Sequence, residues 1–452
     1  MSESNLRIKV MKFGGTSVAK HEARVQSALK VISAKEQGFS PVVVVSAIGR
    51  KGAPYATDTL INMLREIDPA VEPDARELDL LVACGEILSS VIFAHTLKTL
   101  GYHAMAFRGG QAGIRTDGVY GNARIVGINP ISLLRTVEQG SIPVVCGFQG
   151  VYVPGDGAPG GELTTLGRGG SDTTASAVGA ALKAEAVEIF TDVDGVKTAD
   201  PDSVPNAPTL RNVTYDEVAE IAHLGAKVLH PRAAEIAMNF DIPLWVKNTF
   251  SDDQGTEIVR RDRFPGRRVT GVTHTGKLVY LQFDLKDATG EHRRILESRI
   301  FETMARYGLN LFMLNLSPSG TGFAVPRSQF AMLAGILDSL VVPVDGQIYL
   351  LQVGAQPSKD VENQLRLLAP MGTVKTVVAE LTEGCTMVSL VGHDYMQQPG
   401  VFFDVLSALH EAQIPVLQTT DSDYSLSVLI PESETNRCVK SLHERFKLSE
   451  II

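Results

Sequence analysis

Short apolar runs alternate with helical patterns over the first half of the chain. A long helical pattern covers residues 77–100, and the apolar runs lie at residues 6–11, 42–46, 144–147, 187–191 and 243–247. The runs are rich in β-branched residues and contain few polar positions, as expected of strands that are buried on both faces of a sheet. This alternation predicts an α/β domain in which helices cover a parallel or mixed sheet.

The hydrophobic pattern changes after residues 251–269, a polar stretch rich in Asp, Arg, Pro and Gly. Beyond it, a helix-then-strand pattern that contains Leu309 recurs 105 positions later, around Ile414. The recurrence predicts two copies of one small α+β unit, at about residues 276–345 and 385–450.

These patterns also predict the domain boundaries: a first domain at residues 1–255, a linker at 256–269 and a second region at 270–452. Residues 340–384 fit neither copy of the repeated unit. Within them, residues 347–353 have the pattern of a strand and residues 359–368 that of a helix.

Two glycine-rich segments each follow an expected strand and precede an expected helix. Residues 12–17 read KFGGTS, and residues 164–172 read TTLGRGGSD. Glycines allow a backbone to approach a ligand closely or to adopt positive φ, and the free N–H groups at a helix start bind anions. The Thr and Ser side chains of the first segment, and Ser171 or Asp172 of the second, are expected to cap these helices.

Each glycine-rich segment also carries a cation, Lys12 in the first and Arg168 in the second. The planar guanidinium fits a carboxylate or a phosphate, and Asp172 could hold a metal ion that bridges phosphates. One such segment alone is equally well explained as a strand-to-helix turn. Two of them together predict one anionic ligand that is held from two sides.

Composition excludes several classes of protein. The chain has 452 residues, 44% of them hydrophobic and 21% charged, which predicts a globular protein of two or three domains. The net charge of −9 argues against nucleic-acid binding. Four scattered cysteines without a Cys-x-x-Cys pair argue against a zinc site and fit a reducing compartment. Since no targeting segment or long apolar run stands out, we expect a cytoplasmic protein without a membrane partner.

Glu86 lies on a small, mostly apolar face of the helix expected at residues 77–100. A carboxylate there needs a partner, which could be Arg168, another protein cation or the ammonium of a ligand. The alternative is a glutamate that tilts toward solvent.

An acidic strand end and a lysine later in the first domain could contact parts of a nucleotide. Thr191 and Asp192 end an expected strand, where they could contact a ribose, a metal ion or water, or simply begin an Asp-Gly turn. Lys227 could be a second phosphate cation or a surface lysine. His230, next to a proline, is more often structural than catalytic.

The candidate residues include no Ser/His/Asp set and no evident activated base. Phosphoryl transfer needs mainly positioning and charge neutralisation by Lys, Arg, backbone N–H groups and Mg²⁺. A carboxylate acceptor, with a pKa of about 3.9, is already ionised at neutral pH and requires no base. The pattern therefore favours formation of an acyl phosphate over phosphorylation of an alcohol.

Seven short motifs, taken in order, resemble those of the aspartate kinase family, and the segments at residues 49–58 and 417–422 (LQTTDS) resemble its Bacillus-type isozymes. They are KFGGTS at 12–17, VSA at 45–47, CGE at 84–86, GFQG at 147–150, LGRGGSD at 166–172, TDV at 191–193 and GAKVLHP at 225–231. The resemblance covers nearly the whole chain. It implies an amino-acid-kinase αβα sandwich with a mostly parallel sheet, followed by tandem α+β ACT domains.

The resemblance implies ATP-dependent phosphorylation of the β-carboxylate of L-aspartate to 4-phospho-L-aspartate, the first step toward lysine, threonine and methionine. Mg²⁺ is expected to arrive with ATP, without a dedicated metal site. Carried over residue by residue, the catalytic residues are Lys12, Arg168 and Asp172. The implied aspartate pocket consists of Ser46, Thr57, Glu86, Arg168 and Ser171. The implied ATP site consists of Lys12, Gly14, Gly15, Ser17, Thr191, Asp192 and Lys227.

The family's regulation implies an inhibitory end-product amino acid (lysine, threonine or diaminopimelate) and a homodimer or higher oligomer formed through the ACT domains. The candidate effector residues lie in the second copy and are Gly392, Pro399, Gly400, Val401, Gln418, Thr419 and Asp421. The first copy lacks the Pro-Gly pair, which predicts unequal effector binding by the two copies.

One departure from the family pattern affects the nucleotide side. Lys197 stands where the family commonly has Tyr, and Asp202 stands where it commonly has Arg. The nucleotide contact that the family's Arg makes is therefore not expected of Asp202. Two alternatives therefore stay open: a kinase of the same fold with another acceptor, such as glutamate or a nucleoside monophosphate, and an amino-acid sensor whose kinase half is inactive.

Overall fold

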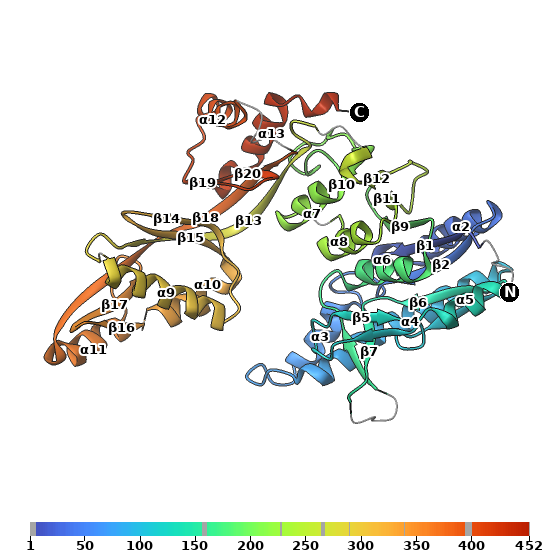
Figure 1. Cartoon of the computed structure of the whole chain (residues 1–452), viewed down its shortest axis with the longest axis horizontal. Coiled ribbons are helices and arrows are strands. Elements are labelled where there is room, and N and C mark those ends of the chain that lie inside the picture. The colour runs from blue at the N-terminus through green and yellow to red at the C-terminus, as the bar shows by residue number, and fades with distance from the viewer. Residues whose placement is uncertain are drawn as a thin grey trace. The chain divides into compact units, whose positions relative to one another are not determined.

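The computed structural model describes residues 6–155, 161–226, 228–263, 267–288, 290–338, 340–393 and 400–451. The chain divides into two compact units, and most of their helices and strands are labelled in Figure 1. The first unit holds most residues up to Arg267. The second holds residues from Arg268 to Ser449 together with the short segment Ala199–Asn206.

An eight-stranded sheet forms the centre of the first unit, with the strand order β10-β12-β11-β9-β1-β2-β6-β3. Among its described pairs, only β11 and β12 run antiparallel. The strands are β1 (Ile8–Phe13), β2 (Ser40–Val45), β3 (Ala104–Phe107), β6 (Ile142–Cys146), β9 (Ala186–Thr191), β10 (Asn212–Thr214), β11 (Leu244–Asn248) and β12 (Thr256–Val259). The five apolar runs of the sequence are β1, β2, β6, β9 and β11, so the prediction of a mostly parallel α/β sheet is confirmed.

Helices lie on both faces of this sheet. Side chains of α2 and α4 pack with Met11, Phe13, Val43 and Val45 in one core cluster. On the other face, a Cβ atom on Gly179 of α6 would lie 2.4 Å from Val187, so only glycine permits this close approach. The helices of the unit are α1 (Gly15–Ala19), α2 (His21–Glu36), α3 (Thr57–Arg65), α4 (Ala75–Thr99), α5 (Ile131–Glu138), α6 (Gly170–Leu182), α7 (Tyr215–His223), α8 (Pro231–Asn239) and the 3₁₀ turn η1 (Arg261–Arg263).

Helix α4 carries Glu86 and is the longest helix among the described residues. Asp74 caps its start by accepting hydrogen bonds from the N–H groups of Arg76 and Glu77. Contrary to the sequence-based expectation, α4 is long and apolar enough to cross a membrane, judged by length and composition alone. Half of its most apolar stretch is buried inside the unit, as in the core helix of a globular domain.

A second, four-stranded sheet in the first unit has the order β5-β4-β7-β8. Its strands are β4 (Ile114–Thr116), β5 (Ile125–Ile128), β7 (Gln149–Tyr152) and β8 (Glu162–Thr165). Strand β8 leads directly into the second glycine-rich segment, so this small sheet sets where that segment begins.

The second unit contains one sheet with the order β14-β15-β13-β18-β17-β16, to which β20 adds on β18 and β19 on β20. The strands are β13 (Gly271–Asp284), β14 (Phe312–Ser317), β15 (Gly320–Pro326), β16 (Val341–Val344), β17 (Gln347–Val353), β18 (Thr373–Val391), β19 (Gln418–Asp421) and β20 (Ser425–Pro431). The helices are α9 (Gly290–Arg306), α10 (Arg327–Leu337), α11 (Lys359–Leu368), α12 (Val401–Glu411) and α13 (Thr435–Arg445), with 3₁₀ turns η2 (Ala369–Met371), η4 (Glu432–Glu434) and η5 (Leu448–Glu450).

The predicted repeat is present in this unit. The order α9-β14-β15-α10 recurs as α12-β19-β20-α13, and β20 begins and ends 105 positions after β15. The repeated units share the long strands β13 and β18, which pair with each other along much of their length.

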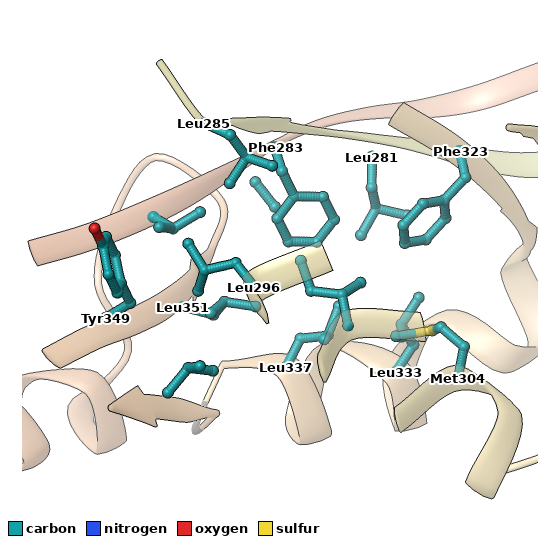
Figure 2. Close-up of a cluster of buried hydrophobic side chains, with 14 of the residues drawn as sticks. Leu281, Phe283, Leu285, Leu296, Met304, Phe323, Leu333, Leu337, Tyr349 and Leu351 are labelled. Carbon is teal, nitrogen blue, oxygen red and sulfur yellow. The ribbon is translucent and has the colours of Figure 1, made fainter. Parts of the chain in front are cut away.

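Residues 340–384 complete the first copy, although the sequence left them unassigned. They form β16, β17, α11 and the first part of β18, and the strand at 347–353 and helix at 359–368 are confirmed. Figure 2 shows Leu351 and Tyr349 packed with Phe283 and Leu296 in one buried cluster. The first core therefore extends well past residue 345. Likewise, residues 256–259 of the predicted linker form β12 of the first sheet.

Candidate active site

The two glycine-rich segments meet at an ion pair. The Nζ atom of Lys12 lies 2.8 Å from Oδ1 of Asp172, and the two side chains are only 12% and 13% exposed. Lys12 comes from β1, and Asp172 comes from the first turn of α6. The two segments therefore lie side by side on the α6 face of the sheet.

In the first segment, Gly15 is required by close packing of backbones. A Cβ atom at this position would lie 2.3 Å from the carbonyl oxygen of Gly49 and 2.8 Å from that of Ala47. Neither Gly14 nor Gly15 has positive φ, and no side chain caps the helix that follows Gly14, so both of those expectations are wrong. The Gly14 N–H instead donates to the Phe190 carbonyl at 3.2 Å, which ties the segment to β9.

Ser17, expected on the nucleotide side, has a fully buried side chain. Its hydroxyl lies 2.7 Å from the hydroxyl of Thr249, the residue after β11. Its carbonyl accepts a hydrogen bond from Ser27 of α2. Ser17 thus fixes the first segment to β11 and α2, a role that sequence spacing alone gave no means of finding.

The second segment turns twice through left-handed backbone. Gly167 and Gly169 have φ values of +72° and +68°, and they bracket Arg168. Helix α6 begins at Gly170 with Gly169 as its N-cap, so neither Ser171 nor Asp172 caps it as predicted. Both residues lie already inside the first turn, which is why Asp172 can reach Lys12.

Arg168 has an exposed side chain, and it forms no ion pair with any residue in the described ranges. Its guanidinium, which is not engaged by a protein carboxylate there, is available to a ligand. The possible Glu86–Arg168 pair is therefore absent from the described part of the chain.

Glu86 is buried, with 2% of its surface exposed. Its Oε1 atom accepts a hydrogen bond from the N–H of Ala47 at 3.1 Å, and its Oε2 atom has no hydrogen-bond partner among the residues that the structure describes. Burial raises the pKa of Glu86 to about 8, against the smaller opposing effect of the Ala47 bond. A buried carboxylate with one free oxygen is suited to a cationic ligand group.

The other residues of the expected aspartate pocket come from the end of β2 and from the first turns of α3 and α6. The Ser46 N–H donates to the Phe13 carbonyl at 3.1 Å, which places Ser46 beside the end of β1. Thr57 begins α3 and is partly buried. Ser171 is 8% exposed, and a Cβ atom on Gly147 would lie 2.6 Å from its Oγ.

The expected nucleotide residues Thr191 and Asp192 lie at the carboxyl end of β9, the neighbour of β1. The Asp192 carboxylate accepts hydrogen bonds from Thr191 at 3.2 Å and from Arg50 at 2.6 Å. Arg50 was not among the predicted residues. It lies in the loop between β2 and α3, and the sequence does not show where such a loop residue is placed. Lys227 lies outside the described residues.

Two further residues of the sequence analysis, His230 and Lys197, carry no catalytic assignment. His230 packs its ring against Gly169, where a Cβ atom would lie 2.1 Å from the ring, and burial lowers the pKa of His230. Lys197 donates to the Ala207 carbonyl and the Thr209 hydroxyl, so its ammonium is used within its own loop.

The candidate effector residues gather in the second unit around β18, β19 and β20. Gly392 follows β18, and its N–H donates to the Tyr424 carbonyl at 2.9 Å. Gln418, Thr419 and Asp421 lie on β19, which pairs with β20. Gly400 caps α12 with a φ of +96°, and the buried Val401 begins that helix. Pro399 lies outside the described residues.

The fold and these groups agree with what sequence comparison shows. The sequence model of the amino acid kinase family matches residues 7–248, and that of the ACT domain matches residues 388–446. The chain belongs to the amino acid kinase family.

Individual relatives specify the reaction. Aspartokinase 1 of Bacillus subtilis (strain 168) is 38% identical over 98% of this chain and 100% of its own, and the aspartokinase of Geobacillus stearothermophilus is 36% identical over 98% of both. In fold, the chain matches E. coli aspartokinase III in complex with aspartate and ADP, with a TM-score of 0.70, 24% identity and coverage of 97% and 99% of the two chains. Within its family this protein is an aspartate kinase, which phosphorylates the β-carboxylate of L-aspartate with ATP.

Proposed function

We propose that Lys12, Arg168 and Asp172 are the catalytic residues of this aspartate kinase. The observation that supports the proposal best is the 2.8 Å ion pair between Lys12 and Asp172. It brings both glycine-rich segments to one place, where the carboxyl ends of β1, β2 and β9 also meet. Parallel sheets bind their ligands at this edge.

Aspartate binds between Glu86 and Arg168 in this proposal. The free Oε2 of Glu86 receives the substrate ammonium, which supplies the cation that the buried carboxylate lacks. The guanidinium of Arg168, which pairs with no acid in the described ranges, holds a substrate carboxylate through two parallel N–H bonds. Ser46, Thr57 and Ser171 complete the pocket.

ATP binds over the first glycine-rich segment and the end of β9. Gly14 and Gly15 allow the phosphates to approach the backbone, with Lys12 beside them. Thr191 and Asp192 would contact the nucleotide, and Lys227 is assigned to the nucleotide from its sequence motif alone. Ser17 contributes by holding the segment against Thr249.

The reaction joins an oxygen of the substrate β-carboxylate to the γ-phosphorus, and the bond from that phosphorus to the β–γ bridging oxygen breaks. The electron pair leaves with ADP, and no proton has to move because the acceptor is already ionised. Lys12 neutralises charge that develops on the phosphoryl oxygens. Glu86 and Arg168 orient the carboxylate for in-line attack.

The donor groups fit a Mg²⁺ ion that enters with ATP. Asp172 Oδ1 is buried and has the Lys12 ammonium beside it at 2.8 Å, and carboxylate oxygen is a ligand that Mg²⁺ prefers. The described residues contain no cluster of three metal-binding side chains, so the protein would supply one or two ligands and the phosphates the rest. When bound, the ion neutralises phosphate charge.

Substitution of Lys12 tests this assignment. Lys12→Met should lower kcat by about 100- to 1,000-fold, the usual cost of one transition-state charge contact. Lys9→Met is the matched control on the same strand, since Lys9 pairs with Glu188 instead of Asp172. A folded Lys12→Met enzyme with the turnover of Lys9→Met would overturn the proposal.

For regulation, we propose that an end-product amino acid binds the second ACT unit at Gly392–Val401 and β19. E. coli aspartokinase III, a match in fold, is known in complex with lysine and aspartate. Lysine, threonine and diaminopimelate are the candidates, and binding through ACT domains would make the enzyme a homodimer or larger. Asp421→Asn should raise the inhibitory concentration of the effector at least tenfold without changing kcat; equal inhibition of both enzymes would place the effector elsewhere.

We also propose that the enzyme functions in the cytoplasm, where its four free cysteines would stay reduced. The kinase domain would extend through β12, the regulatory region would begin near residue 270, and the residues between would connect them.

A further inference from the structure

A second buried carboxylate on α4 lies outside all the residues assigned above. Asp79 is 1% exposed and precedes Glu86 by seven positions, so both project from the same face of the helix. Salt bridges in the described part of the chain do not include Asp79. The carboxylate is instead satisfied by hydrogen bonds alone.

Three donors converge on Asp79. The N–H of Thr165 donates to Oδ2 at 2.8 Å, and the hydroxyl of Thr165 donates to Oδ1 at 2.6 Å. The N–H of Gly121 lies 3.0 and 3.1 Å from the two oxygens. An ionised carboxylate accepts hydrogen bonds at both oxygens and donates none, so Asp79 can satisfy all three donors.

Thr165 is the last residue of β8, and Arg168 follows three residues later. The bonds to Asp79 therefore fix the start of the segment that carries Arg168. Ala123 also donates its N–H to the Thr165 carbonyl at 2.8 Å, so Thr165 is held on both sides.

Leu166, the next residue, is held as well: its N–H donates to the Phe148 carbonyl at 2.9 Å, and its carbonyl accepts from Arg232 at 3.3 Å. Gly167 and Gly169 flank Arg168 in left-handed conformations, and glycine has more backbone freedom than any other residue. Arg168 itself forms no ion pair in the described ranges that could hold it. A small displacement at Thr165 would therefore be carried to the guanidinium.

We infer that Asp79 is a positioning residue for aspartate, which fixes Arg168 relative to Glu86 through Thr165. One face of α4 thereby sets both ends of the acceptor pocket: Glu86 directly, and Arg168 through two hydrogen bonds. The inference rests on the roles proposed for Glu86 and Arg168.

Substitution of Asp79 in the full-length enzyme tests the inference. In Asp79→Asn, the amide N–H group faces one of the three donors, so one bond is replaced by a repulsive contact. We expect aspartate affinity, measured by calorimetry with a non-hydrolysable ATP analogue, to fall about tenfold, and nucleotide affinity to change less than about twofold.

Two variants of Thr165 provide a milder test that keeps the buried carboxylate. Thr165→Val removes the 2.6 Å bond and should weaken aspartate binding, whereas Thr165→Ser keeps the hydroxyl and should bind nearly as the unmodified enzyme does. These variants decide the question if Asp79→Asn does not fold.

A double-substitution cycle separates positioning from general damage. If Asp79 acts through Arg168, Asp79→Asn should have no further effect on aspartate binding in an Arg168→Ala background. Multiplicative effects, equal losses for aspartate and nucleotide, or unchanged binding by folded Asp79→Asn and Thr165→Val would overturn the inference. Unchanged aspartate binding by Arg168→Ala alone would instead overturn the proposed role of Arg168, and the inference with it.

Discussion

The ammonium of Lys12 and the carboxylate of Asp172 lie 2.8 Å apart in a position largely shielded from water. Each is the other's charge partner in the free protein. In the proposed mechanism Lys12 contacts a phosphate of ATP, and Asp172 contacts the cation that accompanies it. Until ATP binds, the ion pair compensates both charges. A shielded ion pair of this kind is costly to break on one side only.

This relationship predicts a stability coupling between the two residues. Lys12→Met and Asp172→Asn should each destabilise the first unit, because each leaves one uncompensated charge. The double variant should be more stable than the sum of the two losses predicts, with a coupling of about 1–3 kcal/mol. Denaturant unfolding of the four proteins measures it, and strictly additive losses would show that the pair contributes nothing.

Glu86 predicts how aspartate affinity depends on pH. With its pKa raised to about 8 by burial, the side chain is mostly protonated in the free enzyme at neutral pH. The substrate ammonium binds the ionised form, so affinity should rise as pH increases from about 6 to 8, and binding should release a proton. Calorimetry in buffers of different ionisation enthalpy measures that proton.

Glu86→Gln is the control for this effect. The variant keeps the shape but cannot ionise, so it should bind aspartate weakly and without the rise between pH 6 and 8. A pH profile that is unchanged in Glu86→Gln would assign the dependence to another group.

The same residue predicts the stability of the free enzyme. Because the folded-state pKa of Glu86 lies above its unfolded value near 4.5, the folded protein binds more protons between those values. Its contribution to stability is therefore full below about pH 4.5 and is lost as pH rises toward 8, by a few kcal/mol. Thermal unfolding at pH 5.5 and 8 should show a larger decline for the unmodified enzyme than for Glu86→Gln.

The sequence predicted the elements of this fold better than it predicted their local geometry. Buried strands such as β9 can be predicted from their apolar residues. The repeat of β15 in β20 can be predicted from the constant difference in residue number between the two copies. Caps depend on one or two backbone angles: Gly169 adopts φ +68° and caps α6 itself, which leaves Asp172 free to pair with Lys12. Composition does not reveal that choice.

Contacts between segments that are distant in the sequence could not be predicted either. The bond between Ser17 and Thr249 and that between Asp79 and Thr165 join residues far apart in the chain, with no motif to mark them. Glu86 could be found because an acid on an apolar helix face is unusual in itself. Arg50 could not, because nothing distinguishes it from other loop cations until Asp192 is seen beside it.

Gly15 predicts a steric limit in the first glycine-rich segment. Gly15→Ala would place a methyl group 2.3 Å from the Gly49 carbonyl oxygen, which is backbone and cannot rotate away. The 47–49 backbone would have to move, so we expect loss of about 2 kcal/mol or more in stability together with most of the activity. Gly155→Ala is the matched control, since no described atom beyond its chain neighbours lies within 4 Å of its added methyl group. Equal activity in the two variants would contradict the close packing.

The position of Leu351 predicts that residues 340–384 are part of the first regulatory core. This side chain on β17 is fully buried beside Phe283 and Leu296 (Figure 2). Leu351→Ala should therefore cost about 2–5 kcal/mol and lower the unfolding transition of the second unit, observed by calorimetry, while the unfolding of the first unit is unchanged. Leu367→Ala, at a position that is 73% exposed on α11, should change stability by less than about 0.5 kcal/mol. If both substitutions were equally mild, the segment would be a peripheral addition, and the first core would end where the sequence pattern placed it.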